Sequence, residues 1–120
     1  MVLWKKSLDQ YISIFPVPAA SFLPIIFAPP GSPVSIHIGI YLPTSGREPE
    51  FLDESSKLRL CLDELGEKFP NSPIFIRGDS NVNPNHSVRV KILNSLANTM
   101  NLASVPILHK TYRRRQVFLQ

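Results

Sequence analysis

The stretch VSIHIGIYL at residues 34–42 decides the fold. Every second residue from Val34 to Leu42 is aliphatic, and the residues between them are polar, small or aromatic. This period of two is typical of a β-strand that buries one face. Pro43 and Gly46 follow and provide the turn signals that end it. We therefore predict a strand over Val34–Leu42 with one face toward a core.

An amphipathic helix is expected after this strand. Pro49 is acceptable in a first helical turn, and Pro70 with Asn71 ends the pattern. Four carboxylates gather near the expected start, where the helix dipole favours negative charge: Glu48, Glu50, Asp53 and Glu54. Apolar residues at helical spacing form one face: Phe51, Leu58, Leu62, Leu65 and Phe69. On the solvent side we expect two ion pairs, Arg59–Asp63 and Glu64–Lys68.

A second strand, Pro73–Arg77, completes a strand–helix–strand unit. The two strands of such a unit are parallel, so their carboxyl ends meet at one edge of the sheet. Tyr41 and Asp79 come at those two ends. Open α/β sheets place their ligand crevices at that edge. The sequence therefore predicts an α/β fold with its site near Tyr41 and Asp79.

Shorter elements flank this unit. Stretches rich in aromatic and β-branched residues predict strands at Val2–Lys6, Tyr11–Phe15 and Phe22–Phe27. Val88–Met100 is a second helix with Ser87 as its N-cap and with Val88, Ile92, Leu96 and Met100 on one face. The remainder of the chain is expected to be loop, with brief strand pieces around Val105 and Thr111–Tyr112.

Composition excludes several classes of protein. Only 18% of the residues are charged and 12 are proline, which argues against a helical bundle, a coiled coil or a charged disordered tail. The uncharged stretch Tyr11–Ala28 contains three prolines, which would break a membrane-spanning helix, so we expect no membrane partner. Cys61 is the single cysteine, which excludes an internal disulfide framework and a zinc site of several thiolates. We expect no disulfide-linked partner and an intracellular location, nuclear or cytoplasmic.

The loop GDSNVN at residues 78–83 carries the candidate chemistry. A carboxylate beside a carboxamide at a strand end can act in two ways. Asp79 can accept a proton from water or share in holding a divalent cation, and Asn81 can orient that carboxylate or donate to a phosphate oxygen. The alternative is an ordinary turn, because Gly, Asp and Asn favour turns for local reasons.

The strand that ends IGIYLP (residues 38–43), the helical crossover and IFIRGDSN (residues 74–81) together resemble the endonuclease/exonuclease/phosphatase superfamily, the deoxyribonuclease-I-like and apurinic-endonuclease-like enzymes. The later stretch HKTY at residues 109–112 is similar to endonuclease domains of non-LTR retrotransposons. LWKKSL at residues 3–8 also looks like an early strand of those domains. The resemblance implies that residues 1–120 are the central part of such a domain. The implied architecture is an incomplete two-sheet α/β sandwich, truncated at both ends, with helices on the outside.

The resemblance also implies roles for three residues. Asp79 would activate the attacking water and neighbour the metal, Mg²⁺ or Mn²⁺. Asn81 would orient Asp79 and bind the scissile phosphate, and Tyr41 would contact the same phosphate. His37 lies on the same face of its strand as Tyr41, whereas His86 and His109 are expected to be loop residues without a direct role.

The implied activity is hydrolysis of phosphodiester bonds in nucleic acid, with DNA favoured. Two elements of the superfamily are missing, however: a strand with a glutamate metal ligand, and the Ser-Asp-His element near the end. Ser80 also departs from the larger apolar or aromatic residue common between the Asp and the Asn. The alternative functions are a non-catalytic nucleic-acid-binding module and an inert remnant.

The basic end of the chain accounts for its whole net charge of +4, through Lys110, Arg113, Arg114 and Arg115. Such a cluster can bind the phosphate backbone of nucleic acid. It can equally be a solvated terminus.

Titration of a labelled DNA duplex at several salt concentrations tests this basic end. If each of the four cations meets one phosphate, log Kobs falls with log[salt] with a slope of about −3.6 from this cluster. Replacing Arg113, Arg114 and Arg115 with Ala then reduces the magnitude of the slope by about 2.7. An unchanged slope would show that these arginines are merely solvated.

Overall fold

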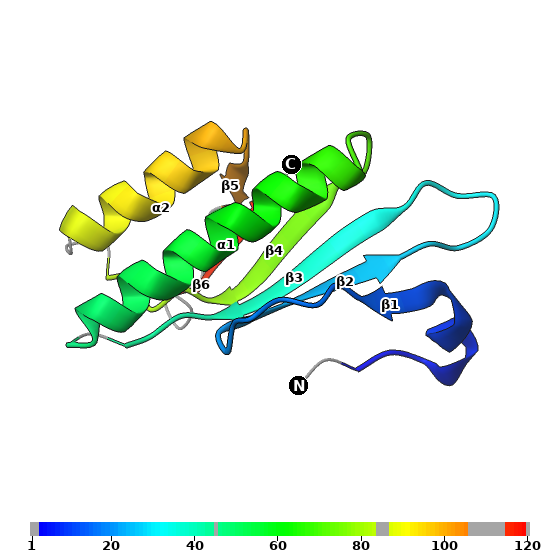
Figure 1. The fold of residues 1–120 in the computed structure, drawn as a ribbon, viewed down its shortest axis with the longest axis horizontal. Coiled ribbons are helices and arrows are strands. Elements are labelled where there is room, and N and C mark those ends of the chain that lie inside the picture. The colour runs from blue at the N-terminus through cyan, green and yellow to red at the C-terminus, as the bar shows by residue number, and fades with distance from the viewer. Residues whose placement is uncertain (1–2, 45, 84–86, 106–114, 120) are drawn as a thin grey trace.

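The computed structural model describes residues 3–44, 46–83, 87–105 and 115–119, which form an α/β fold around one mixed sheet (Figure 1). The elements in chain order are the 3₁₀ helix η1 (Lys6–Tyr11), β1 (Ile12–Ile14), β2 (Phe22–Phe27), β3 (Ser35–Tyr41), α1 (Glu48–Lys68), β4 (Ile74–Asp79), α2 (Ser87–Thr99), β5 (Ala103–Val105) and β6 (Arg115–Leu119). The strand order is β1-β2-β3-β4-β6-β5. Only the central pair, β3 and β4, is parallel.

The predicted strand–helix–strand unit is confirmed as β3–α1–β4. The parallel register runs from Ile36 opposite Ile74 to Tyr41 opposite Asp79. The carboxyl ends of β3 and β4 therefore meet at one edge of the sheet, as expected from the order of these elements.

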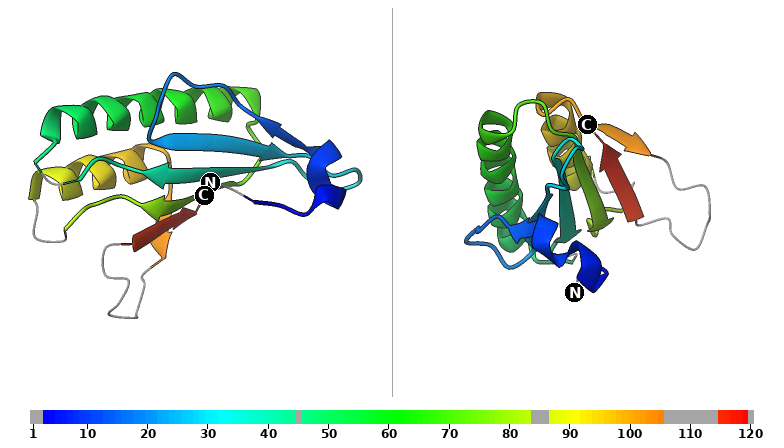
Figure 2. Two further views of the ribbon diagram at one scale, coloured as in Figure 1. Left: turned by 90° about the horizontal axis from the view of Figure 1, so that it is seen from below. Right: turned by 90° about the vertical axis from the view of Figure 1, so that its right-hand side faces the viewer.

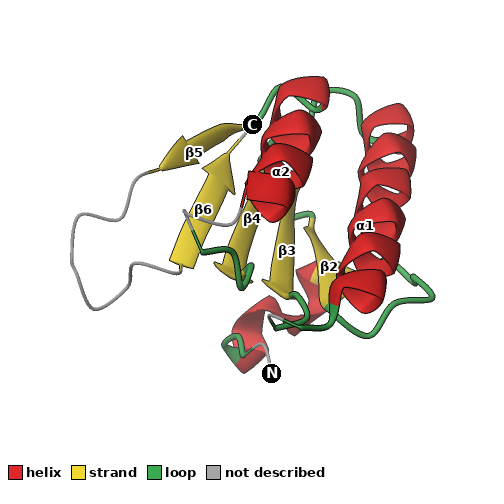
Figure 3. Ribbon diagram, turned by 90° about the vertical axis from the view of Figure 1, so that its left-hand side faces the viewer, coloured by secondary structure: helices red, strands yellow, loops and turns green. Residues whose placement is uncertain are grey.

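Both long helices lie on the same face of the sheet (Figures 2 and 3). The side chains at alternate positions of β3 and β4 that point toward them are buried: Ile36, Ile38, Ile40, Ile74 and Ile76. They pack against apolar residues of the helices, namely Phe51, Leu58, Leu62 and Leu65 of α1 and Leu93, Leu96 and Ala97 of α2. The core is thus a single layer between the sheet and the two helices, formed by the predicted periodicities of two and 3.6.

The opposite face of the sheet is not covered by a second sheet among the described residues. Leu23 and Ile14 expose 36% and 54% of their surface there, and Tyr41 exposes 65%. The α/β class is confirmed, and the helices lie outside the sheet as expected. The described residues form one sheet, where the sequence resemblance implied two.

The amino-terminal strand expected at Val2–Lys6 is wrong for the described part of that range. Leu3, Trp4 and Lys5 belong to no strand, and Lys6–Tyr11 forms η1. The indole Nε1 of Trp4 donates a hydrogen bond of 3.0 Å to Asp9 Oδ1. This local contact supports a compact turn where the amino-acid types favoured a strand.

The carboxyl-terminal strand β6 was missed. Its sequence, RQVFL, places three apolar residues in succession and shows no alternation, so the expected loop there is wrong. β6 lies between β4 and β5 and pairs with both, so it forms through partners distant in the sequence. Strand pieces expected at Thr111–Tyr112 lie outside the described residues.

Two surface ion pairs expected on α1 are absent, since neither Arg59–Asp63 nor Glu64–Lys68 is formed among these described side chains. Lys57 instead pairs with Asp53 at 3.0 Å. Exposed pairs of this kind contribute little to stability, so their absence costs the helix little.

The described residues include no helix that is both long and apolar enough to span a membrane.

At Gly78, β3 and β4 approach so closely that no side chain fits between them. Its φ is +138°, and a Cβ added there would collide with the backbone carbonyl oxygen of Ile40. Gly66, in the last turn of α1, has open space around it. The first glycine is therefore required by the fold, and the second is not.

Replacing Gly78 with Ala is expected to destabilise the fold by about 2–4 kcal/mol, because backbone strain and a steric clash combine. Gly66→Ala is the matched control and should stabilise α1 by about 0.5–1 kcal/mol. Urea denaturation followed by circular dichroism measures both. Equal effects of the two substitutions would contradict the steric role of Gly78.

Candidate functional site

Tyr41 and Asp79 meet at the carboxyl edge of the parallel strand pair. They are direct register partners, and the backbone N–H of Leu42 donates a hydrogen bond of 2.9 Å to the carbonyl oxygen of Asp79. Tyr41 is exposed, and Asp79 is half-buried. Both residues lie on the face of the sheet away from the helices, since Tyr41 follows the buried Ile40 by one position and Asp79 follows the buried Ile76 by three. The predicted position of these two residues at one edge is confirmed.

Asn81 joins the ends of the two strands. Its backbone N–H donates to Asp79 Oδ1 at 2.9 Å, and its side-chain Nδ2 donates to the carbonyl oxygen of Leu42. Its φ of +52° is in the left-handed region, which asparagine tolerates better than most residues. The turn and the candidate site therefore use the same contacts. Since an amide group has two N–H donors and one acceptor oxygen, the Leu42 contact leaves Asn81 able to contact a ligand.

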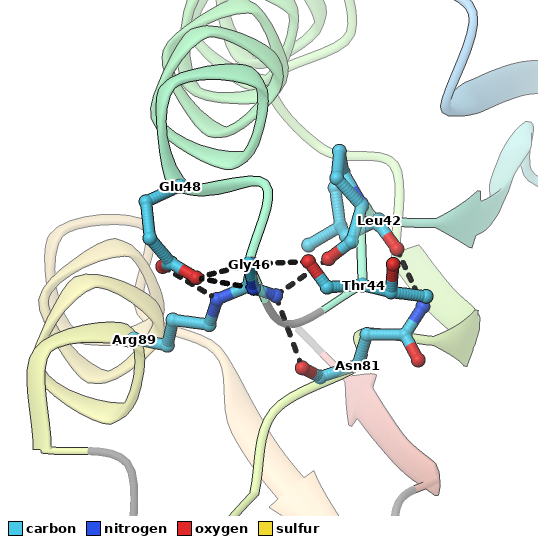
Figure 4. Close-up of polar contacts among 7 residues, drawn as sticks. Leu42, Thr44, Gly46, Glu48, Asn81 and Arg89 are labelled. Carbon is cyan, nitrogen blue, oxygen red and sulfur yellow. Dashed lines mark hydrogen bonds and ion pairs between the residues drawn. The ribbon is translucent and has the colours of Figure 1, made fainter.

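Arg89, at the start of α2, holds the loops behind this edge, and sequence reasoning missed it (Figure 4). Its side chain is fully buried. Nε and Nη2 bind the two carboxylate oxygens of Glu48 at 2.9 and 3.0 Å. The guanidinium also donates to the carbonyl oxygens of Pro43, Thr44 and Asn81, and it lies 4.1 Å from the centre of the Phe51 ring. One cation thus ties α2, the β3–α1 loop, the first turn of α1 and the Asp79–Asn81 loop together.

The sequence contains a signal for Arg89 in the spacing of α2. Arg89 precedes Leu93 by four positions and Leu96 by seven, so it lies on the buried face of the helix. The face predicted from Val88 is wrong at that residue, which is 57% exposed. An arginine within an apolar helical stripe indicates a buried cation with several acceptors.

A hollow of about 770 Å³ lies beside Tyr41, between the β1–β2 loop and the first turns of α1. Glu54 of α1 forms part of its wall and accepts hydrogen bonds from the backbone N–H groups of Ala20 and Ser21 at 3.1 and 3.0 Å. Burial alone would raise the pKa of Glu54, but the bonds from Ser21 and Ala20 and the charge of Lys57 outweigh it and lower the pKa below its usual value. Glu54 is therefore an ionised anchor for the β1–β2 loop.

His37 does not reach the edge. It is paired with Phe75, four residues before Tyr41 and Asp79 in the register, and its ring stacks on Phe75 at 5.1 Å. The Oγ of Ser35 lies 3.0 Å from its Nε2. Burial and the charge of Arg77 lower the pKa of His37, which favours the neutral ring. His86 and His109 lie outside the described residues.

The described residues do not fit a resident Mg²⁺ or Mn²⁺ site. No group of three or more His, Cys, Asp or Glu side chains converges in the described part of the chain, so Asp79 is the one predicted ligand that stands at the edge. Protein sites for Mg²⁺ usually combine carboxylates with further oxygen ligands. Cys61 offers no alternative, because burial and the charge of Glu64 raise the pKa of its free thiol to about 11.

The predicted nucleic-acid contacts fall mostly outside the described residues, which do not include Lys110, Arg113 and Arg114. Arg115 begins β6, and its backbone is paired with Asp79. The strand β6 therefore brings the end of the basic cluster to the same edge as the candidate site.

The fold is similar to a solved structure, the human Nocturnin catalytic domain with bound sulfate anion, with a TM-score of 0.62 and 12% sequence identity. The match covers 92% of this chain and 49% of the Nocturnin chain, so the chain spans about half the length of that structure. At this identity the likeness shows the fold alone. No protein-family model matches the sequence. No curated protein matches it either.

Replacing Arg89 with Met, which keeps much of the volume but removes the donors, is expected to cost about 2–4 kcal/mol of unfolding free energy. The backbone acceptors of three loop residues and the Glu48 carboxylate lose their partner at once. Lys91→Met is the matched control on the same helix, since Lys91 is exposed, and it should change stability by less than about 0.5 kcal/mol. Urea denaturation of both variants measures the difference. An Arg89→Met variant as stable as the wild type would contradict the proposed stabilising role of the Arg89 contacts.

Proposed function

We propose that the chain is part of a metal-dependent phosphodiesterase domain, an endonuclease that acts on nucleic acid, with DNA as the favoured substrate. The observation that carries the proposal is the meeting of Tyr41, Asp79 and Asn81 at the carboxyl edge of β3 and β4. The same edge belongs to a fold similar to half of a catalytic domain.

In the proposed site each residue has a separate task. The Asp79 carboxylate, oriented by the N–H of Asn81, accepts a proton from the attacking water. The exposed hydroxyl of Tyr41 and the amide of Asn81 donate to the phosphate, where negative charge grows during the reaction. The shared loop geometry sets the position of all three groups before substrate binds.

The finer parts of the proposal rest on the sequence resemblance. They are dependence on Mg²⁺ or Mn²⁺, an origin in a non-LTR retrotransposon and a second sheet that completes a two-sheet sandwich, whereas the proposed intracellular location rests on the single cysteine, Cys61. The metal in particular requires ligands beyond Asp79, such as the glutamate of the superfamily strand that the sequence lacks. Residues 1–120 are accordingly proposed as the central part of the domain.

Nuclear magnetic resonance of the ¹⁵N-labelled chain tests this site directly. A short DNA duplex should shift the amide signals of Tyr41, Asp79 and Asn81, and Mn²⁺ should broaden them only when the duplex is present, since one carboxylate holds the cation only together with phosphate oxygens. Asp79→Asn keeps the acceptor for the Asn81 N–H, so it should abolish the broadening and preserve the shifts. If the duplex shifts other amide signals but not those of Tyr41, Asp79 and Asn81, the result would contradict the proposed site.

This chain alone should produce no measurable Mg²⁺-dependent nicking of supercoiled plasmid DNA, because its described residues provide too few metal ligands. Agarose electrophoresis after prolonged incubation measures the nicked fraction. Robust nicking that Asp79→Ala abolishes would show that the missing elements are unnecessary. Salt-dependent DNA binding that leaves Tyr41, Asp79 and Asn81 unshifted would favour a non-catalytic binding module.

A further inference from the structure

A groove between α1 and α2 lies apart from the candidate site, on the helical side of the molecule. Its volume is about 350 Å³. The α1 residues that line it recur at helical spacing and so share one stripe: Leu52, Ser55, Ser56 and Arg59. The α2 wall repeats the same mixture of residue types, with Lys91, Ile92, Ser95 and Leu96.

The charge of the groove is positive. Arg59 and Lys91 stand on opposite walls, both are exposed, and neither forms an ion pair or a hydrogen bond with a described residue. The lining contains no carboxylate, and α2 as a whole contains none. Of the nearby carboxylates of α1, Asp53 and Glu54 line the hollow beside Tyr41 instead. Asp63, four residues after Arg59, is outside the lining and forms no ion pair with Arg59. The groove therefore attracts an anion without competition from its own walls.

Ser55 supplies an independent observation. It is 5% exposed, and its Oγ is buried without a hydrogen-bond partner. A serine within a helix commonly satisfies its hydroxyl by bonding back to a carbonyl oxygen of the preceding turn, and no such bond is formed here. A buried hydroxyl that lines a cationic groove and lacks a partner is a donor available to a ligand.

The apolar residues of the groove indicate what kind of molecule the anionic group belongs to. Leu52, Ile92 and Leu96 give the groove an apolar part beside the cations and hydroxyls. A phosphate group satisfies an arginine, a lysine and several hydroxyl donors at once, and a sugar attached to it would cover the apolar part. We propose that the groove binds a phosphate group, with Arg59 and Lys91 as its cations and Ser55 as its buried donor. This site is separate from the one at Asp79 and does not depend on the proposed function.

The test follows the backbone amide signals of the two groove walls in the ¹⁵N-labelled full chain. One titration uses inorganic phosphate at constant ionic strength, and a second uses a ten-residue oligothymidylate without divalent cations. At least one probe should shift the amides of residues 55–59 and 91–95 along a saturable, single-site curve. Saturation by inorganic phosphate alone identifies a free phosphate ligand, whereas tighter saturation by the oligonucleotide identifies the backbone of a nucleic-acid strand.

Three variants assign the binding to the proposed groups. Ser55→Ala should raise the dissociation constant about tenfold, because a buried hydrogen bond to a charged ligand is lost. Arg59→Gln and Lys91→Gln should each raise it about three- to fivefold, as expected for exposed cations. Lys68→Gln, on α1 but outside the groove lining, is the matched control and should leave it unchanged.

The amide spectrum of each variant shows whether the fold is retained, so a loss of binding is not confused with unfolding. The absence of saturable shifts with both probes would overturn the proposal. The proposal would also be overturned if Ser55→Ala, Arg59→Gln and Lys91→Gln all bound the probes as tightly as the wild type. Neither result bears on Asp79, which the duplex and Mn²⁺ experiment tests separately.

Discussion

The guanidinium of Arg89 is buried where four segments of the chain converge, and the geometry of the carboxyl edge depends on it. Taking such a cation out of water is costly unless its donors are satisfied. Here Glu48 supplies the opposite charge, and backbone carbonyl oxygens of two loops accept the remaining hydrogen bonds. Both loops that follow the parallel strands must therefore adopt the conformation that presents these oxygens. These loops follow directly on Tyr41 and Asp79, which the parallel pairing of β3 and β4 places side by side.

The contacts around Asp79 serve the fold and the proposed chemistry together. Asn81 bonds to Asp79 through its backbone and to Leu42 through its side chain, so it closes the strand ends as an ordinary turn would. The same bonds fix the direction of the carboxylate. Stability and function consequently cannot be separated here by removing Asn81 alone, which is why isosteric change at Asp79 is the more informative substitution.

The two faces of the sheet differ in what covers them. One face packs on α1 and α2, whereas the other exposes Ile14, Leu23 and Tyr41. The Nocturnin catalytic domain, to which the fold is similar, is a chain about twice as long as this one. As part of the proposed function, we propose that a second sheet packs on the exposed face, which would put the edge at Asp79 between two sheets. Metal ligands absent from the described residues would be supplied from that side.

The sequence by itself determined β3, α1 and β4, because each has a strong local period and clear end signals at Pro43, Pro49 and Pro70. From these three elements alone the parallel register and the meeting of Tyr41 with Asp79 could be predicted. The elements toward the two ends of the described chain could not be predicted, since η1 is accompanied by a hydrogen bond from Trp4 to Asp9 and β6 forms by pairing with β4 and β5.

Tertiary structure alone decided which polar groups became buried. The spacing of α2 places Arg89 on the buried face, but its acceptors come from other segments that meet it only in the folded chain, and nothing local leaves the hydroxyl of Ser55 without a partner. Periodic patterns describe how one element meets the core, whereas a buried polar group is satisfied by atoms from several elements at once. The arrangement of those atoms exists only after the elements have packed together.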